Sequence, residues 1–371
     1  MQDRIAAAHV HLVSAPVEGS FADATRKVES LGFVIVRLLT KDGREGVGIT
    51  YNEVGGEATA ELIRRNIVPK LIGRDPLETE VIWQEMFHYL RGVGRKGLTY
   101  CALSAVDIAL WDLKGKILGL PVYKLLGGNS TQVPVYGSGG WTSYSDDELV
   151  AEVTGMVASG YTAVKFKVGV SGGTDLRRDV ERVRKVREAV GPDIRLMVDA
   201  NNCFDAARAV QLANRIREFD IFFFEEPVFA DDIPGLARFR RGTDIPLATG
   251  EHEYTKFGVR DLLVNEAADI VQVDGARVGG YTELVKCAAL TQAWNVKFAP
   301  HAMEHIHLHF AAATPNVLFL ERLLIFEGIS DQVFRSPRPP AQGVMEIPDL
   351  PGLGFVLDLD FIRDHETSLL G

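Results

Sequence analysis

The chain has 371 residues, of which 46% are hydrophobic and 24% charged, and its formal net charge is −10. This length suits one large core with a second module, and the composition is typical of a globular protein. No apolar run approaches the roughly 18 residues of a membrane span, and an acidic chain without a basic stripe argues against nucleic acid as a partner.

The cysteines and the N-terminus indicate a cytoplasmic protein. Cys101, Cys203 and Cys287 are too few and too scattered for a disulfide framework or a zinc site. No signal-peptide-like apolar segment follows Met1. We therefore expect a reducing compartment and no membrane attachment.

The N-terminal region is predicted to open as an antiparallel β-meander. Residues 4–12, 31–40 and 46–51 have strand character, and the Asp-Gly turn at 41–43 joins the last two. The polar, Gly/Pro-containing stretch Ser14–Asp23 is predicted to be a loop.

Helices are expected to complete this first domain. Apolar spacing predicts them at 57–72, 76–91 and 98–118. The third is rich in small residues, which suggests tight packing, and Gly119 suits its C-terminus. Residues 1–128 are accordingly predicted to be an α+β capping domain.

The rest of the chain alternates strand and helix. The first strand is predicted at 132–137, and the helical runs are 146–159, 176–190, 205–217, 257–265, 280–293 and 303–312. Such alternation indicates a parallel sheet. We predict an α/β fold: a modified TIM barrel, (β/α)7β, at 129–330, with the N-terminal cap completed by a C-terminal return at 331–371.

Successive apolar runs of the predicted barrel end in ionisable residues. In chain order these are Lys167, Asp199, Glu225, Glu251, Asp274, His301 and Glu321. The spacing between neighbours fits one strand, one helix and two short loops. Barrel active sites are built at the C-terminal ends of the strands, and buried parallel strands are near-continuous apolar runs. The series is therefore predicted to form a catalytic rim.

Three consecutive members of the rim predict a metal site. The carboxylates of Asp199, Glu225 and Glu251 would converge, and they cannot all stay ionised without a counter-charge. All-oxygen ligation suits one Mg²⁺ per subunit; unrelated salt bridges are the alternative. Glu226 would point the other way, behind the ligands, where it could pair a lysine.

The other members of the rim suggest acid–base chemistry. Lys165 and Lys167 share a strand face, so repulsion is expected to depress the pKa of Lys167 toward general-base duty. Asp274 and His301 can form a carboxylate-oriented imidazole. Glu321 is expected to end the last strand, where its protonated form could donate a hydrogen bond to an oxyanion.

Several further polar residues have open interpretations. Asn201 could bond a metal ligand or substrate, or cap a turn, and His252 is placed to touch substrate. His305 and His309 have the spacing of a helical metal pair beside His307, but no carboxylate completes such a site in the sequence. We favour a structural role for this cluster.

The ordered set Lys-x-Lys, Asp, Glu-Glu-Pro, Gly-Glu, Asp, His, Glu resembles the enolase superfamily and, within it, the mandelate racemase/muconate lactonizing enzyme family. The resemblance covers essentially the whole chain. It implies Mg²⁺ on Asp199, Glu225 and Glu251, Lys167 as one base and a His301–Asp274 dyad facing it. It also implies Lys165 and Glu321 on the substrate carboxylate. Superfamily members use a Lys or His base with Mg²⁺ and an enediolate.

The reaction class implied is proton abstraction α to a carboxylate, with several outcomes. The polar cap loops, 14–27 and the segment at Tyr51, suit a hydroxylated sugar acid. Phe21, Tyr51 and Trp141 are candidates to line the pocket, although Trp141 could equally be core. We predict an acid-sugar (aldonate or aldarate) dehydratase, a hydro-lyase, that assembles as a homo-oligomer of two to eight copies.

Other functions use the same rim. A racemase or epimerase of a 2-hydroxy acid, or a sugar-lactone cycloisomerase, would need the same residues. An alternative of another class is a catalytically silent binding protein on this scaffold. The intact Lys167, Asp274, His301 and Glu321 favour an enzyme.

Overall fold

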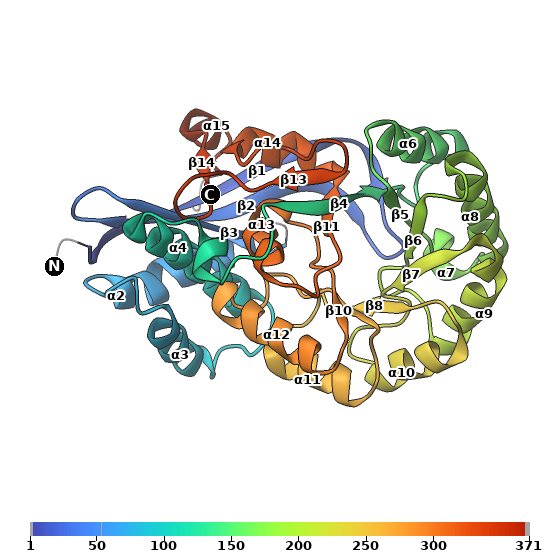
Figure 1. Ribbon diagram of the computed structural model, residues 1–371, viewed down its shortest axis with the longest axis horizontal. Coiled ribbons are helices and arrows are strands. Elements are labelled where there is room, and N and C mark those ends of the chain that lie inside the picture. The colour runs from blue at the N-terminus through green and yellow to red at the C-terminus, as the bar shows by residue number, and fades with distance from the viewer. Residues whose placement is uncertain (1–2, 53, 368–371) are drawn as a thin grey trace.

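The computed structural model describes residues 3–52 and 54–367. In these residues a capping domain packs against a barrel (Figure 1). The cap opens with an antiparallel sheet of order β1-β2-β3. Its strands are β1 (Ile5–Ala22), β2 (Lys27–Thr40) and β3 (Glu45–Tyr51). The predicted meander is present in the structure.

The segment predicted as the loop Ser14–Asp23 is instead mostly strand. β1 continues to Ala22, and Ala15 and Phe21 pair with Leu31 and Val28 of β2 across a register shift. Pairing with a long neighbouring strand overrides the local Gly/Pro signal, and the irregularity accommodates the residues between Pro16 and Phe21.

The helices of the cap pack on one face of this sheet. They are α1 (Gly56–Leu62), α2 (Val68–Leu71), α3 (Thr79–Leu90), α4 (Leu98–Leu118) and α5 (Val122–Leu125), with a π-helical turn at Ile63–Ile67. A Cβ on Gly48 of β3 would lie 2.0 Å from Ala105 O of α4. The predicted tight packing of α4 therefore depends on glycine as well as on small helical residues.

Eight parallel strands form the barrel in the part of the chain that the structure describes. They are β4 (Gln132–Gly139), β5 (Ala163–Lys167), β6 (Arg195–Asp199), β7 (Ile221–Glu225), β8 (Leu247–Thr249), β9 (Ile270–Val271), β10 (Lys297–Phe298) and β11 (Leu320–Leu323). They run β10-β9-β8-β7-β6-β5-β4-β11. Phe298 N donates to Asn316 O, and Leu318 N donates to Phe298 O. Asn316 and Leu318 lie just before β11, so these hydrogen bonds join the β10 end of the order to its β11 end.

Among the described residues, seven helices separate these strands, which gives the predicted (β/α)7β topology. They are α6 (Asp146–Ala158), α8 (Leu176–Val190), α9 (Ala206–Ile216), α10 (Ile233–Gly242), α11 (Lys256–Val264), α12 (Tyr281–Ala293) and α13 (Glu304–Ala313), with a short α7 (Val170–Gly173). The sequence prediction omitted α10. Its signal was Asp232, whose side chain caps the helix, followed by Pro234 in the first turn.

The C-terminal return contacts both domains. It contains α14 (Glu327–Val333), β12 (Phe334–Ser336), β13 (Val344–Glu346), β14 (Val356–Leu357) and α15 (Leu359–Asp364). β13 pairs with β4 of the barrel, whereas Thr367 N donates to Leu12 O of the cap at 2.8 Å. The tail thus ties the first barrel strand to β1.

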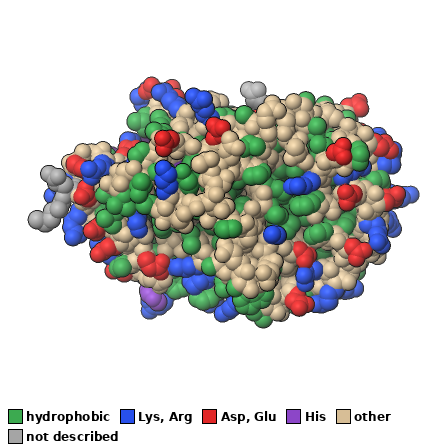
Figure 2. Space-filling view, in the orientation of Figure 1, with side chains coloured by type: hydrophobic (Ala, Val, Ile, Leu, Met, Phe, Trp, Pro, Cys, Tyr) green, Lys and Arg blue, Asp and Glu red, His purple; other side chains and the backbone are tan. Residues whose placement is uncertain are grey.

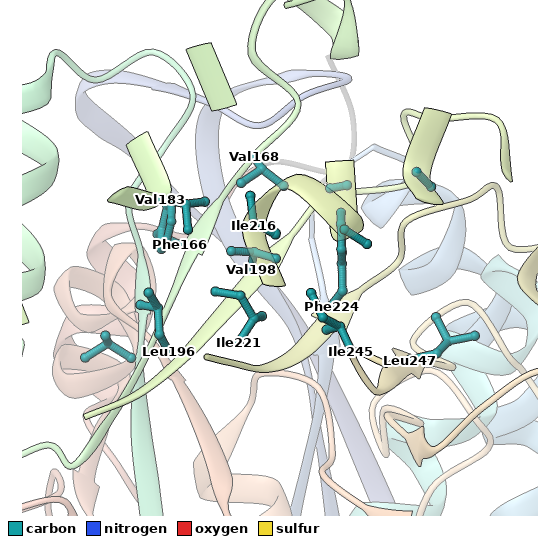
Figure 3. Packing of buried hydrophobic residues seen from close by; sticks show 14 of the residues in the cluster. Phe166, Val168, Val183, Leu196, Val198, Ile216, Ile221, Phe224, Ile245 and Leu247 are labelled. Atoms are coloured by element: carbon teal, nitrogen blue, oxygen red, sulfur yellow. The ribbon is translucent and has the colours of Figure 1, made fainter. Parts of the chain in front are cut away.

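The barrel core surrounds the strands that carry the rim. Phe166, Leu196, Val198 and Phe224 point outward from β5, β6 and β7 and pack against the surrounding helices (Figure 3). Full burial of such a side chain contributes about 1.5–3 kcal/mol. The alternate residues of these strands face the barrel axis, where the ionisable side chains lie.

Candidate active site

The two lysines of β5 point into the barrel, as their spacing predicted. Val164 and Phe166 pack outward, whereas Lys165 and Lys167 extend inward and are 0% and 6% exposed. Lys165 Nζ lies 2.6 Å from Glu225 Oε2 and 2.7 Å from Glu321 Oε1. Lys167 Nζ lies 2.5 Å from Asp199 Oδ2. Each ammonium therefore has a carboxylate partner.

These contacts reverse the expected effect on Lys167. Burial lowers its pKa and so does Lys165, but Asp199 and the other carboxylates outweigh both, so the pKa is raised. The prediction of a depressed pKa is wrong here because the attraction of Asp199, with Glu225 and Glu321, outweighs the repulsion from Lys165.

The three predicted metal ligands form a row along the mouth of the barrel. Asp199 and Glu225 end β6 and β7 and are register partners, and Glu251 follows β8 by two residues. All three are buried, and burial raises the pKa of Glu225 to about 8. Glu225 Oε1 is a buried atom without a hydrogen-bond partner. Asp199 and Glu251 also act electrostatically on Glu225, and an orphaned buried carboxylate oxygen under the influence of other carboxylates fits a hard divalent cation such as Mg²⁺.

Asp274 and His301 form the predicted pair at the other end of this row. His301 Nδ1 lies 2.9 Å from Asp274 Oδ2, and His301 Nε2 lies 3.3 Å from Glu251 Oε2. Burial by itself lowers the pKa of His301, but Glu251 and Asp274 raise this pKa by more, so that it reaches about 9. The imidazole is thus oriented by one carboxylate and directed at another.

The cap supplies a further contact to this dyad. Tyr51, the last residue of β3, donates its hydroxyl to Asp274 Oδ2 at 2.5 Å. The Arg277 guanidinium lies 4.7 Å from the Tyr51 ring centre and 3.1 Å from Glu251 Oε1. Sequence reasoning missed Arg277, although an arginine three residues after Asp274 could have been noted.

Glu321 and Glu226 differ from their predicted surroundings. Glu321 is the second residue of β11 rather than its end. Burial raises its pKa, but Lys165 and other cations lower it to about 2, so it is ionised rather than a hydrogen-bond donor. Glu226 is buried and pairs with His252 Nδ1 at 2.6 Å rather than with a lysine. It does not point away from the predicted ligands, because its carboxylate lies within 4.8 Å of ligand atoms of Glu251 and His252, a group that could itself hold a metal ion.

The remaining polar candidates surround the carboxylates. Asn201 N donates to Asp199 Oδ1 at 2.8 Å, and its amide lies 3.2 Å from Asp199 Oδ2. Gln272 Nε2, which sequence reasoning missed, donates to Glu225 Oε2 at 2.6 Å. Its position two residues before Asp274 was the available signal. These amides orient carboxylates that would hold a cation.

A cavity of about 510 Å³ lies between the cap and this rim. Tyr51, Asn201 and His252 line it, whereas Phe21 and Trp141 are not among its lining residues. The full lining is Asp23, Thr25, Arg26, Tyr51, Val54, Thr59, Gly97, Leu98, Cys101, Asn201, Asn202, Phe229, Glu251, His252, Tyr254 and Arg277. Trp141 stacks edge-on with Phe21, 5.7 Å between ring centres, and lies 5.7 Å from Lys167 Nζ.

The histidines of α13 do not form a joint site in the described part of the chain. His305 lies near Glu304 and Asp331, whereas His309 contacts the backbone of Tyr123 and Leu353. His307 makes separate backbone contacts beside the dyad. The favoured structural interpretation agrees with these separate surroundings.

Comparison with known proteins identifies the family. Residues 5–127 match the family model described as mandelate racemase/muconate lactonizing enzyme, N-terminal domain, and residues 148–361 match the model described as enolase C-terminal domain-like. The chain belongs to the mandelate racemase/muconate lactonizing enzyme family. The predicted family and fold class are therefore confirmed.

Relatives within this family carry out more than one reaction. The chain is 33% identical to L-talarate/galactarate dehydratase of Salmonella typhimurium over 96% of this chain and 89% of that protein. It is 34% identical to 3,6-anhydro-alpha-L-galactonate cycloisomerase of Streptomyces coelicolor over 94% of this chain and 96% of that protein. Both sequences align over almost their full length.

Solved structures of family members agree with the fold. A racemase from Streptomyces coelicolor, solved with bound magnesium, superposes with a TM-score of 0.93 at 33% identity, covering 98% of this chain and 100% of that one. The Salmonella dehydratase, liganded with Mg and L-lyxarohydroxamate, gives 0.91 at 32% identity, covering 98% and 93%. Magnesium is thus present in structures of two relatives.

Within the described residues, no helix combines the length and apolarity needed to cross a membrane. On the face shown in Figure 2, basic and acidic side chains are interspersed.

Proposed function

We propose that the chain is a Mg²⁺-dependent acid-sugar dehydratase that removes the proton α to a carboxylate and then expels the β-hydroxyl. One observation carries the proposal. Lys167 contacts one end of the carboxylate row at Asp199, and His301 contacts the other end at Glu251. Two proton-transfer groups thus flank the residues that would hold the cation.

The chain's own residues account for most of the chemistry. Asp199, Glu225 and Glu251 would hold Mg²⁺, which when bound would supply positive charge toward the substrate carboxylate. Lys165, buried beside Glu225, adds a fixed ammonium where negative charge develops. The Asp274 carboxylate orients the His301 imidazole.

The proposed steps balance without another reactant. The unprotonated amine of Lys167 or the unprotonated imidazole of His301 takes the α-proton, and the electron pair of the C–H bond forms an enediolate. That electron pair then expels the β-hydroxyl, which leaves as water after it receives a proton from the dyad or the lysine. The enol that remains becomes a 2-keto acid. The configuration of the substrate determines which base faces the α-proton.

The cavity lining supports a polyhydroxylated substrate. Hydroxyl, amide, carboxylate and imidazole groups from both domains line it, including Asp23, Thr25, Asn202 and His252. Hydrogen-bonding groups of this kind suit sugar hydroxyls better than an aromatic ring. The reaction of the Salmonella dehydratase is in the same class.

A cycloisomerase or racemase is the second candidate, because relatives with those names share the fold and most of the sequence length. Either reaction begins with the same proton removal. In a cycloisomerase a carbon–oxygen bond then breaks without loss of water, whereas in a racemase the proton is returned to the α-carbon.

The test is a screen of aldonic and aldaric acids and their lactones with Mg²⁺ in D₂O. Formation of a 2-keto acid, trapped with semicarbazide, is expected from one configuration. Deuterium at C2 without keto acid would replace dehydration with racemisation. Isomerisation of a lactone without semicarbazone would indicate the cycloisomerase. Absence of all three, with Mg²⁺ bound, would favour a silent binding protein.

A further inference from the structure

His307 of α13 connects the two loops that carry the dyad. The Gly275 N–H, next to Asp274, donates to His307 Nε2 at 2.7 Å. His307 Nδ1 lies 2.8 Å from Ala302 O, next to His301. The imidazole is fully buried. The His307 side chain therefore links the residue after Asp274 to the residue after His301.

These contacts determine the state of the ring. A backbone N–H can only donate, so Nε2 of His307 must accept and carries no proton. Nδ1 must then hold the proton that is donated to Ala302 O. His307 is accordingly a neutral imidazole with one tautomer, and neither nitrogen is free to exchange protons with substrate.

The turn that His307 holds is strained. Ala302 and Met303 adopt φ of 43° and 44°, the left-handed region that side-chain-bearing residues seldom use. The Ala302 N–H donates to Glu321 Oε2 at 2.9 Å, while its C=O accepts from His307. Both polar groups of this residue are thus held by buried side chains from different elements.

We propose that His307 is a positioning residue for the Asp274–His301 dyad, which it holds at the mouth of the barrel by fastening Gly275 to Ala302. Its catalytic consequence rests on the proposed function, whereas its structural consequence does not. Small displacements of a catalytic group are costly, because a shift of about 1 Å can reduce rate about 10²-fold.

His309 offers a matched control on the same helix. It is also fully buried, and it too bridges a backbone N–H and a backbone C=O: Tyr123 N donates to Nδ1, and Nε2 lies near Leu353 O, both at 3.2 Å. Its contacts reach α5 and the C-terminal return rather than the dyad. His307→Leu and His309→Leu therefore remove the same kinds of bonds at two different places.

The first measurement needs no substrate. Amide hydrogen exchange, followed by mass spectrometry of the full chain with Mg²⁺, is expected to rise at least about tenfold at Gly275 in His307→Leu, because its N–H loses its acceptor. Exchange should also rise in the turn around Ala302, because the C=O of this residue loses the donor that holds the turn. His309→Leu should leave these segments unchanged and accelerate exchange around Tyr123 and Leu353. His307→Gln, which keeps a donor and an acceptor, should restore part of the protection.

The second measurement uses α-proton exchange in D₂O with epimeric acids. His307→Leu should slow α-proton exchange about 10- to 100-fold for the epimer whose proton His301 removes. The change should be smaller for the epimer whose proton Lys167 removes. KM should change little, since His307 does not touch the cavity. His309→Leu should affect the two epimers equally.

A second variant covers the case in which His307→Leu does not fold. A Cβ on Gly275 would lie 3.0 Å from His307 Nε2, so Gly275→Ala should push the two groups apart and give the same changes with smaller size. Equal hydrogen exchange at the dyad loops in the His307 and His309 variants would overturn the proposal. If wild type exchanges no acid, the proposed function fails, while hydrogen exchange still decides the role of His307.

Discussion

The two halves of the rim are held in place by different means. On β5, β6 and β7, the functional residues Lys167, Asp199 and Glu225 are the last residues of five-residue strands and are paired in register across the sheet. β9 and β10 are only two residues long. Asp274 lies three residues after the end of β9, and His301 lies three residues after the end of β10.

This difference shows where outside support is needed. Sheet hydrogen bonds position the lysine and the first two carboxylates directly. The dyad instead depends on further side chains: Tyr51 from the cap, Arg277 from the loop after β9, and His307 from α13. Distant substitutions should therefore disturb the dyad more readily than the carboxylate row.

The largest effect should follow from breaking the carboxylate row. Asp199→Asn removes one charge at nearly constant shape, and we expect loss of Mg²⁺ binding by calorimetry and at least about a 10³-fold fall in kcat, since a metal ion contributes several kcal/mol. Asp146→Asn, which loses a carboxylate paired with Arg178 on the outer helices, should bind Mg²⁺ normally. Unchanged Mg²⁺ affinity in Asp199→Asn would remove this residue from the ligand set.

Removing one base at a time tests whether the two halves oppose each other. Lys167→Met and His301→Asn should each lower α-proton exchange about 10²- to 10⁴-fold, but for opposite configurations at the α-carbon. Deuterium incorporation by NMR from each epimer is the measurement. If both variants lose the same epimer, the two residues act on one face and the opposed arrangement is wrong.

Loss of the cap contact should have a moderate effect on the dyad alone. Tyr51→Phe removes the hydroxyl that donates to Asp274, and about a tenfold fall in kcat is expected, equivalent to a hydrogen bond of about 1.5 kcal/mol to a charged group. The α-proton exchange of the epimer that reacts with Lys167 should change less. Tyr100→Phe provides a control, because Tyr100 is another buried cap tyrosine and lines a different cavity from Tyr51. Equal losses in both variants would mean a general effect on the cap.

The smallest effect on activity should come from Asp107 of α4, which accepts from Thr282 N and Oγ1 of α12 at 2.8 and 2.6 Å. Burial raises its pKa from 3.8 to about 7. The folded state keeps a proton that the unfolded chain releases. Its stabilising contribution is therefore complete below about pH 3.8 and is lost as pH rises to about 7.

Asp107→Asn should remove this pH dependence. Between these pH values the free energy of unfolding of wild type, relative to the variant, should fall by up to about 1.4 kcal/mol per pH unit. Urea unfolding at a series of pH values measures the difference, with kcat near neutral pH as the control. Parallel curves for the two proteins would show that Asp107 ionises normally.

Much of the fold could be predicted because its signals are local. Apolar runs gave the strands of the barrel, helical spacing gave α4 and most barrel helices, and a final ionisable residue marked the ends of β5, β6 and β7. β1 was mispredicted beyond Ser14 because its pairing with β2 is not visible in a Gly/Pro-containing segment. α10 was missed although Asp232 and Pro234 mark its start.

The sequence by itself determined the order of the charged residues around the rim, because parallel strands bring their C-terminal ends to one edge. Only the tertiary structure decided how those charges behave. Lys167 holds its proton more tightly, Glu321 is ionised and Glu226 faces His252, because each pKa and each partner depends on distances between elements remote in the chain. The contacts of His307 with both loops are likewise visible only in the tertiary structure, because α13 is remote in the chain from Asp274.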